Sequence, residues 1–109
     1  MNLYAQYIKE REDREIIVLG HAFATYKKLN PETYYLIDMF VERAYRRTNL
    51  AWDLNNIICD IAKKDGASNI ITSICTDAAG VTVSMAVILA GGFKFSSASG
   101  NMLYFVKDL

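Results

Sequence analysis

Residues 33–64 change from an apolar pattern of period two to one of period three to four. Residues 33–41 alternate as a β-strand does, and both of the faces they form are mostly apolar. One face carries Tyr35, Ile37, Met39 and Val41, and the other carries Tyr34, Leu36, Asp38 and Phe40. A strand that is apolar on both faces is usually central in its sheet. The pattern therefore predicts a buried, central strand that begins near Thr33.

An amphipathic helix is predicted directly after this strand, from Asn49 to Lys64. Its apolar positions recur at helical spacing, and they are Leu50, Leu54, Ile57, Ile58, Ile61 and Ala62. The sequence Lys63-Lys64-Asp65-Gly66 supplies cations and a glycine at its end. The turn Arg46-Arg47-Thr48-Asn49 joins strand and helix. Free N–H groups at a helix start, together with two arginines, are typical of an anion site. The alternative is that Arg46 and Arg47 belong to a solvated turn before an ordinary crossover helix, and spacing alone slightly favours it.

The first thirty residues are less decisive. Residues 4–10 alternate loosely and favour a strand that forms a hairpin with residues 15–26, but Leu3, Tyr7 and Ile8 also fit a short helix over residues 3–12. The sequence Lys27-Lys28-Leu29-Asn30-Pro31-Glu32 indicates a turn around the only proline. We predict three meandering strands before the first firm helix.

Beyond the helix, residues 68–75 have strand character and should return parallel to the central strand, as a β-α-β crossover requires. Residues 76–80 predict a loop. In residues 81–90 the β-branched side chains favour a strand, whereas Val81, Met85, Ile88 and Leu89 fit one helical face, so propensity alone leaves this segment open. Residues 93–96 and 102–107 predict a closing hairpin around a Ser-Ala-Ser-Gly-Asn turn.

Composition bounds the class of protein. The chain has 109 residues, of which 52% are hydrophobic and 22% charged, so we expect one domain over residues 1–109 with a single core. Twelve basic and twelve acidic residues cancel, and only Arg43, Arg46 and Arg47 form a local positive cluster. This balance gives no general nucleic-acid signal. The longest apolar run, near residues 81–90, is too short for a bilayer, which needs about 20 residues.

The two cysteines, Cys59 and Cys75, lie in apolar segments without paired spacing or a ligand-like histidine nearby. This usage predicts reduced, buried thiols in a cytoplasmic protein and no metal site. Cys75, at a strand end, could be a nucleophile only with a partner base, and none is evident in the sequence. His21 is the only histidine, and a lone histidine in a strand is usually packed or exposed rather than catalytic.

The order of these residues resembles the GNAT acetyltransferases, whose central strand and loop commonly read DLYVxPxYRGKGIGxxL. The corresponding residues are Asp38-Met39-Phe40-Val41, Tyr45-Arg46, Asn49-Leu50-Ala51 and Leu54, and Gly92-Phe93 stands where the family usually has a Gly-Phe pair. The loop signature Gln/Arg-x-x-Gly-x-Gly/Ala falls on Arg46, Asn49 and Ala51. Arg43 replaces the family proline, and Asn49 replaces the middle glycine. Because asparagine enters the left-handed region readily, we expect the turn to survive.

The resemblance implies an α/β GNAT-like fold with a mixed central sheet: an antiparallel meander, a β-α-β crossover, a helix over residues 81–90 and a closing hairpin. It also implies that the chain lacks the strand and two helices with which most members begin. Acetyl-CoA would lie where the central strand and its parallel neighbour splay apart. The backbone of Met39, Phe40 and Val41 would hold pantetheine, and the pyrophosphate would be surrounded by Arg46, Arg47, Thr48, Asn49, Leu50 and Ala51.

An acetyl transfer to an amine needs a base, and Asp38 is the better candidate than Glu42. It comes from a strand predicted to be buried, where loss of water would make a carboxylate a stronger base. A structural or substrate-orienting role for Asp38 is an equal alternative. The family's acid tyrosine corresponds to Ile88, so Tyr104 on the closing hairpin is the substitute that we consider, although such tyrosines often belong to the core or its rim.

The resemblance implies an acetyl-CoA-dependent N-acetyltransferase acting on a primary amine. Without the family's first helices the acceptor side should be open, which suits a protein lysine or another large substrate, or a second subunit of a homodimer that completes the wall. The alternative is a degenerate GNAT-fold module that binds a protein partner and has lost catalysis, and Asn49 and Ile88 favour it. Fold analogy alone does not name a substrate.

Overall fold

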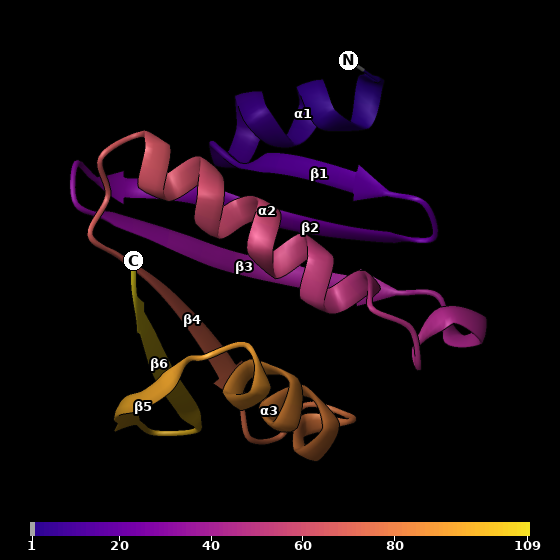
Figure 1. Ribbon diagram of the computed structural model, residues 1–109, viewed down its shortest axis with the longest axis vertical. Coiled ribbons are helices and arrows are strands. Elements are labelled where there is room, and N and C mark those ends of the chain that lie inside the picture. The colour runs from indigo at the N-terminus through magenta and orange to yellow at the C-terminus, as the bar shows by residue number, and fades with distance from the viewer. Residues whose placement is uncertain (1) are drawn as a thin grey trace.

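The structure is a computed structural model, and it describes residues 2–109. Within these residues, six strands and three α-helices follow one another, with a short 3₁₀ turn at Arg43–Tyr45 (Figure 1). The helices are α1 (Leu3–Glu12), α2 (Leu50–Lys64) and α3 (Val81–Ala90). The strands are β1 (Glu15–Leu19), β2 (Ala22–Asn30), β3 (Thr33–Val41), β4 (Asn69–Cys75), β5 (Lys94–Ser99) and β6 (Met102–Asp108).

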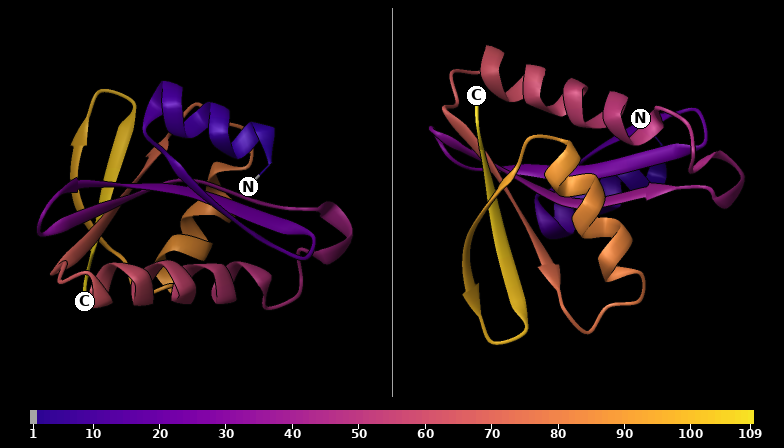
Figure 2. Two further views of the ribbon diagram at one scale, coloured as in Figure 1. Left: turned by 90° about the horizontal axis from the view of Figure 1, so that it is seen from above. Right: turned by 60° about the horizontal axis from the view of Figure 1, so that its bottom comes forward.

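The strands form one mixed sheet in the order β1-β2-β3-β4-β6-β5. Only the β3–β4 pair is parallel, and α2 is the crossover between its two strands. Helix α1 lies on one face of the sheet and α2 on the other (Figure 2). The core lies between the sheet and α2, where Leu54, Ile58 and Ile70 are fully buried, and α3 packs against this core through Val81, Met85 and Ile88. The α/β fold with an antiparallel meander, a crossover and a closing hairpin is confirmed.

The first segment is a helix, so the predicted strand at residues 4–10 is wrong and the helical alternative is confirmed. Asn2 caps α1, because its side-chain oxygen accepts a hydrogen bond of 2.7 Å from the Ala5 backbone N–H. Ala5 and Ile8, three positions apart, are its two buried residues.

The meander itself is shifted relative to the prediction. Residues 15–26 form two strands rather than one, because Gly20 has a positive φ of 59° and turns the chain with His21. Lys27 and Lys28 belong to β2, where they pair with Tyr35 and Tyr34. The predicted turn is therefore limited to Pro31 and Glu32.

Near the C-terminus, the structure settles the open choice for residues 81–90 as the helix α3. Strand β5 extends to Ser99, so the predicted five-residue turn shrinks to Gly100 and Asn101. All of β5 is exposed, and it is an edge strand of the sheet. Central position is confirmed for β3, which lies between β2 and β4.

A β-bulge interrupts the alternation of β3. Thr25 pairs with Asp38 but the next residue, Tyr26, pairs with Leu36, so Ile37 has no opposite residue. Before and after the bulge, the core face of β3 is therefore formed by Tyr34, Leu36, Met39 and Val41. The two predicted faces are wrong beyond residue 36, because one extra residue exchanges the faces of all positions that follow.

Candidate functional site

Strands β3 and β4 separate after four paired residues. Their parallel register runs from Thr33 with Asn69 to Leu36 with Thr72 and stops there, although both strands continue. Figure 1 shows the two strands diverging beyond this point. We call the space between the diverging segments the cleft and the Leu36–Thr72 pair its apex. The splayed strands that the resemblance implied are thus present.

Two side-chain hydrogen bonds bridge the strands at the apex, one on each face. On the core face, the Thr72 hydroxyl donates a hydrogen bond of 2.9 Å to the Leu36 carbonyl oxygen. On the opposite face, the Tyr35 and Ser73 hydroxyls lie 2.6 Å apart. Sequence reasoning missed these four residues, since only the strand register brings them together.

Residues 37–41 of β3 offer the cleft a free backbone edge. Met39, Phe40 and Val41 pair with β2 on one side, and they have no strand partner on the β4 side. The extra residue Ile37 lies directly at the apex, where the bulge disturbs the regular ladder. A free strand edge presents N–H and C=O groups in alternation, and an extended ligand can pair with them.

The loop between β3 and α2 is built around Arg46. Its Nε donates a hydrogen bond of 2.9 Å to the Val41 carbonyl oxygen, and its guanidinium lies 5.7 Å from the centre of the Phe40 ring. Arg46 therefore fixes the end of β3. Arg47 is exposed and has no hydrogen-bond or ion-pair partner among residues 2–109, so its charge, like that of Arg43, is available to a ligand.

The first turn of α2 has unsatisfied donors. The Leu50 N–H donates a long bond of 3.4 Å to the Thr48 hydroxyl oxygen, whereas the Ala51 and Trp52 N–H groups have no acceptor in the described chain. Such groups, with the positive end of the helix dipole, form an anion site. Asn49 has φ −88° and ψ 11°, so the expected left-handed conformation at this residue is wrong.

Asp38 lies on the face of the sheet that α1 occupies, and it is not desolvated. Its side chain is 56% exposed, and one carboxylate oxygen accepts hydrogen bonds from Arg14 at 2.7 Å and from the buried Thr25 at 3.2 Å. The other oxygen has no partner in residues 2–109. The expectation of a buried carboxylate is corrected, because the bulge moves Asp38 off the core face.

The same face carries the other catalytic candidate, Tyr104. It lies on β6 directly opposite Ser73 of β4 and is half-buried. Its neighbour in sequence, Phe105, points to the core face and is 2% exposed. The structure thus places Asp38, Ser73 and Tyr104 on one face of the sheet, around the apex. We call this side, opposite α2, the open face, since α1 covers only its β1 end (Figure 1).

A groove of about 470 Å³ lies on the open face between α1 and the ends of β1, β2 and β3. Its lining is mostly apolar and includes Ile16, Val18, Phe23 and Phe40. His21 and Glu42 stand at the same place, and the His21 ring Nδ1 contacts the Glu42 carboxylate while the ring stacks on Tyr45 at 3.9 Å. The histidine therefore links the β1–β2 turn to the loop that follows β3, and it is packed rather than isolated.

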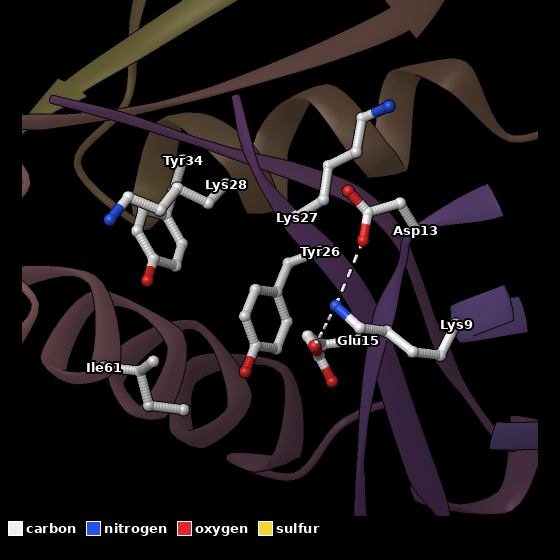
Figure 3. Close-up of a pocket in the computed structure, with 8 residues that line it drawn as sticks. All are labelled: Lys9, Asp13, Glu15, Tyr26, Lys27, Lys28, Tyr34 and Ile61. Carbon is white, nitrogen blue, oxygen red and sulfur yellow. Dashed lines mark hydrogen bonds and ion pairs between the residues drawn. The ribbon is translucent and has the colours of Figure 1, made fainter. Parts of the chain in front are cut away.

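A second pocket, of about 310 Å³, lies at the other end of α2 (Figure 3). Its polar groups largely satisfy one another: Lys9 binds Asp13 and Glu15, and Asp65 binds Lys28 and the Tyr34 hydroxyl. Burial and the Asp65 contact raise the pKa of Tyr34 to about 12. The hydrogen bonds from Lys28 and Tyr34 lower the pKa of Asp65. The contacts around this pocket hold Tyr34 of β3 to the end of α2, and neither Leu36 nor Thr72 of the apex lines it.

The cysteines and the possible metal ligands of residues 2–109 form no second reactive site. Cys59 and Cys75 are free thiols, and burial raises the pKa of Cys59. Within residues 2–109, no three histidine, cysteine or acidic side chains gather as metal ligands. The helices of this part of the chain are all too short or too polar to cross a membrane.

Solved structures with the same arrangement are acetyltransferases. A Bacillus subtilis acetyltransferase in complex with CoA matches with a TM-score of 0.73 and 16% identity over 95% of this chain and 83% of its own. The PaiA N-acetyltransferase of Thermoplasma acidophilum, in complex with coenzyme A, matches with a TM-score of 0.76 and 15% identity over 94% of this chain and 66% of its own.

A putative GNAT-family acetyltransferase from Desulfovibrio desulfuricans gives a TM-score of 0.72 with 12% identity, over 81% of this chain and 60% of its own. No protein-family model matches the sequence, and comparison with curated proteins finds no match. At these identities the likeness is one of fold. The chain has the GNAT fold of the acetyltransferases.

Proposed function

We propose that the chain binds acetyl-CoA in the cleft and transfers the acetyl group to a primary amine. The observation that carries the proposal is the end of the β3–β4 pairing at Leu36 and Thr72, which leaves the edge of residues 37–41 free beside the first turn of α2. Two solved structures of the same fold contain coenzyme A, which supports this choice of ligand.

The residues of the cleft fit the parts of this coenzyme. Within Met39, Phe40 and Val41, the groups directed to the cleft are the N–H and C=O of Met39 and the N–H of Val41, because Phe40 is bonded to β2 and the Val41 carbonyl oxygen accepts from Arg46. These groups would pair with the pantetheine amides, as an added strand does. The pyrophosphate would lie on the free N–H groups of α2, with Thr48, Asn49, Leu50 and Ala51 around it and Arg47 supplying charge. Arg46 shapes this loop through Val41 rather than meeting the phosphates directly.

The amine would approach from the open face. The free oxygen of Asp38 would accept a hydrogen bond from the amine and either orient it or take its proton, directly or through water. The groove beside Phe40 would accommodate the rest of the acceptor, and its open rim suits a lysine of a protein or another large substrate. A backbone N–H of residues 37–39 would stabilise the oxyanion that forms at the thioester carbon.

The leaving thiolate takes up a proton at the end of the reaction. Tyr104 is one candidate donor on the open face, and a second is argued below. Ile88, at the position of the family's acid, packs against the core and carries no proton.

A second function rests on Ile88 and on the apolar surface of α3, where Val83 is 69% exposed. In this second function, the chain keeps the GNAT fold, binds a protein partner and has no transfer activity. A homodimer whose second subunit completes the wall of the open acceptor side belongs instead to the transferase proposal.

Mass spectrometry of the purified protein, with and without added acetyl-CoA, separates the two functions. A co-purifying coenzyme or an acetylated target supports the transferase. Binding of a protein partner, together with no increase in melting temperature at millimolar acetyl-CoA, supports the module, because a ligand that binds only the native state must stabilise it.

A further inference from the structure

The hydroxyl pair of Tyr35 and Ser73 lies at the apex of the cleft, and within residues 2–109 neither hydroxyl forms another hydrogen bond. Its oxygens are 2.6 Å apart, and both side chains are half-buried on the open face. Ser73 is the first residue of β4 beyond the parallel register with β3. The pair therefore stands where the two strands begin to diverge, beside the proposed position of the thioester.

The pair has one hydrogen to spare. Two hydroxyl groups carry two hydrogens, and the bond between them uses one, whichever oxygen is the donor. Residues 2–109 offer no other acceptor for the second hydrogen. The Thr72 hydroxyl, on the core face of the same apex, differs in this respect, since its single hydrogen is donated to the Leu36 carbonyl oxygen.

We propose that the Tyr35–Ser73 pair gives the leaving thiolate its proton, with Ser73 as the catalytic residue and Tyr35 as a positioning residue. This inference rests on the proposed function. It explains how a chain with Ile88 at the position of the family's acid can still assist thiolate departure.

The proton balance closes with groups that the chain and water supply. As the amine nitrogen bonds to the carbonyl carbon, it loses a proton to Asp38 or to water. The carbon–sulfur bond breaks, and its electron pair stays on sulfur. Ser73 Oγ then gives a proton to that sulfur. The Tyr35 hydroxyl gives its proton to the Ser73 oxygen, and Tyr35 then takes a proton from water on the open face. The products are an amide and a thiol.

The placement of Ser73 favours it over Tyr104. Tyr104 belongs to β6, one strand farther from β3, and pairs with Ser73 on the side away from the cleft. Ser73 belongs to β4, one of the two strands that border the cleft, and its hydroxyl is directed toward β3 by the bond to Tyr35. Other titratable or charged groups of this face near the apex are Asp38 with its partner Arg14, Lys27, which pairs with Tyr35 in the register of β2 and β3, and Cys75, two residues after Ser73 on β4.

The test is a pH titration of the thiol of unacetylated coenzyme A in complex with the full chain. The ultraviolet absorbance of the thiolate follows the titration. A hydroxyl donor stabilises a thiolate, so the pKa of the bound thiol should rise by about one pH unit in Ser73→Ala, the size of a charge-assisted hydrogen bond. Tyr35→Phe should raise it less. Ser73→Thr, which keeps a hydroxyl, should restore the parent value, and Tyr104→Phe should leave it unchanged.

Calorimetric binding of coenzyme A by each variant accompanies the titration. If the parent does not bind coenzyme A, the proposed function itself fails. If it binds and Ser73→Ala titrates as the parent does, the function stands and the hydroxyl pair is not the donor. A shift in Tyr104→Phe alone would assign the role to Tyr104. Should Ser73→Ala not fold, an unchanged titration in Tyr35→Phe overturns the proposal.

Discussion

Residues 33–36 of β3 have strand partners on both edges, whereas residues 37–41 have a partner only on the β2 edge. The first segment buries Tyr34 and Leu36 against α2 and the core. In the second segment, the side chains of Asp38 and Phe40 are exposed. One strand therefore supports the core with its paired half and provides a backbone edge with its unpaired half, and the bulge at Ile37 separates the two.

This difference shows how a small sheet forms a site without losing its core. After the bulge, Met39 and Val41 still face the core, so their side chains hold the unpaired half of β3 against it. The same shift turns Asp38 toward the open face, where Arg14 and Thr25 hold it. Substitutions in the paired half should therefore alter stability, and those in or beside the unpaired half should alter binding or turnover.

The largest effect is expected from Leu36→Ala. Leu36 is 6% exposed, and truncating a buried leucine costs about 2–5 kcal/mol of unfolding free energy. Phe40→Ala, in the unpaired half, should cost about 1 kcal/mol or less, since that side chain is 47% exposed. Denaturant unfolding measures both. Equal losses for the two variants would remove the distinction between the halves.

Asp38→Asn should lower turnover by about 10²-fold, the usual size of a lost acid–base group, while acetyl-CoA binding is retained. Turnover is measured on the amine acceptor that mass spectrometry identifies. Glu12→Gln is the matched control, because Glu12 is the other carboxylate bound to Arg14, at 3.2 Å. An Asp38→Asn variant with parental turnover at every pH would exclude Asp38 from the reaction.

Arg47→Glu should weaken acetyl-CoA binding about tenfold or more, since a carboxylate beside the first turn of α2 would repel the phosphates. Lys64→Glu makes the same charge change in the last turn of the same helix and should leave the affinity nearly unchanged. Isothermal titration calorimetry at fixed ionic strength compares them. Equal losses would mean that the effect is one of net charge and not of position.

The smallest effect is expected from Asn49→Val. The backbone at Asn49 is not left-handed and its side chain makes no capping bond, so stability and coenzyme affinity should change little, by about 0.5 kcal/mol. Gly20→Val is the contrast, because φ at Gly20 is 59° and a β-branched residue there is strained by about 1–3 kcal/mol. Melting temperatures of the two variants should differ accordingly. A loss of binding in Asn49→Val would restore a glycine-like role for this loop position.

The sequence predicts well those elements that have a regular period and local end signals. Strand β3 begins at Thr33 as predicted, and α2 ends at Lys64, before the predicted glycine stop. Helix α1 is predicted only as the alternative to a strand, because it has almost no apolar face, with only Ala5 and Ile8 buried. Its signal was the cap at Asn2, which a period search does not weigh.

The site depends on pairing between distant residues, which a local pattern does not contain. The bulge at Ile37 is fixed by the register with β2, and it exchanges the faces of the residues that follow. The exposure of Asp38 and its contact with Arg14, 24 residues earlier, follow from that register. The Tyr35–Ser73 contact likewise joins residues 38 positions apart. A single sequence without its strand pairings predicts none of these.

Amide hydrogen exchange with and without acetyl-CoA tests the central claim most directly, because it reads the two halves of β3 separately. Binding in the cleft should slow exchange at Met39 and Val41, whose N–H groups face away from β2, and at Ala51 and Trp52, whose N–H groups lack acceptors in the described chain. Residues 33–36, already paired on both edges, should change little. Protection confined to another part of the chain, or none at saturating acetyl-CoA, would contradict the account.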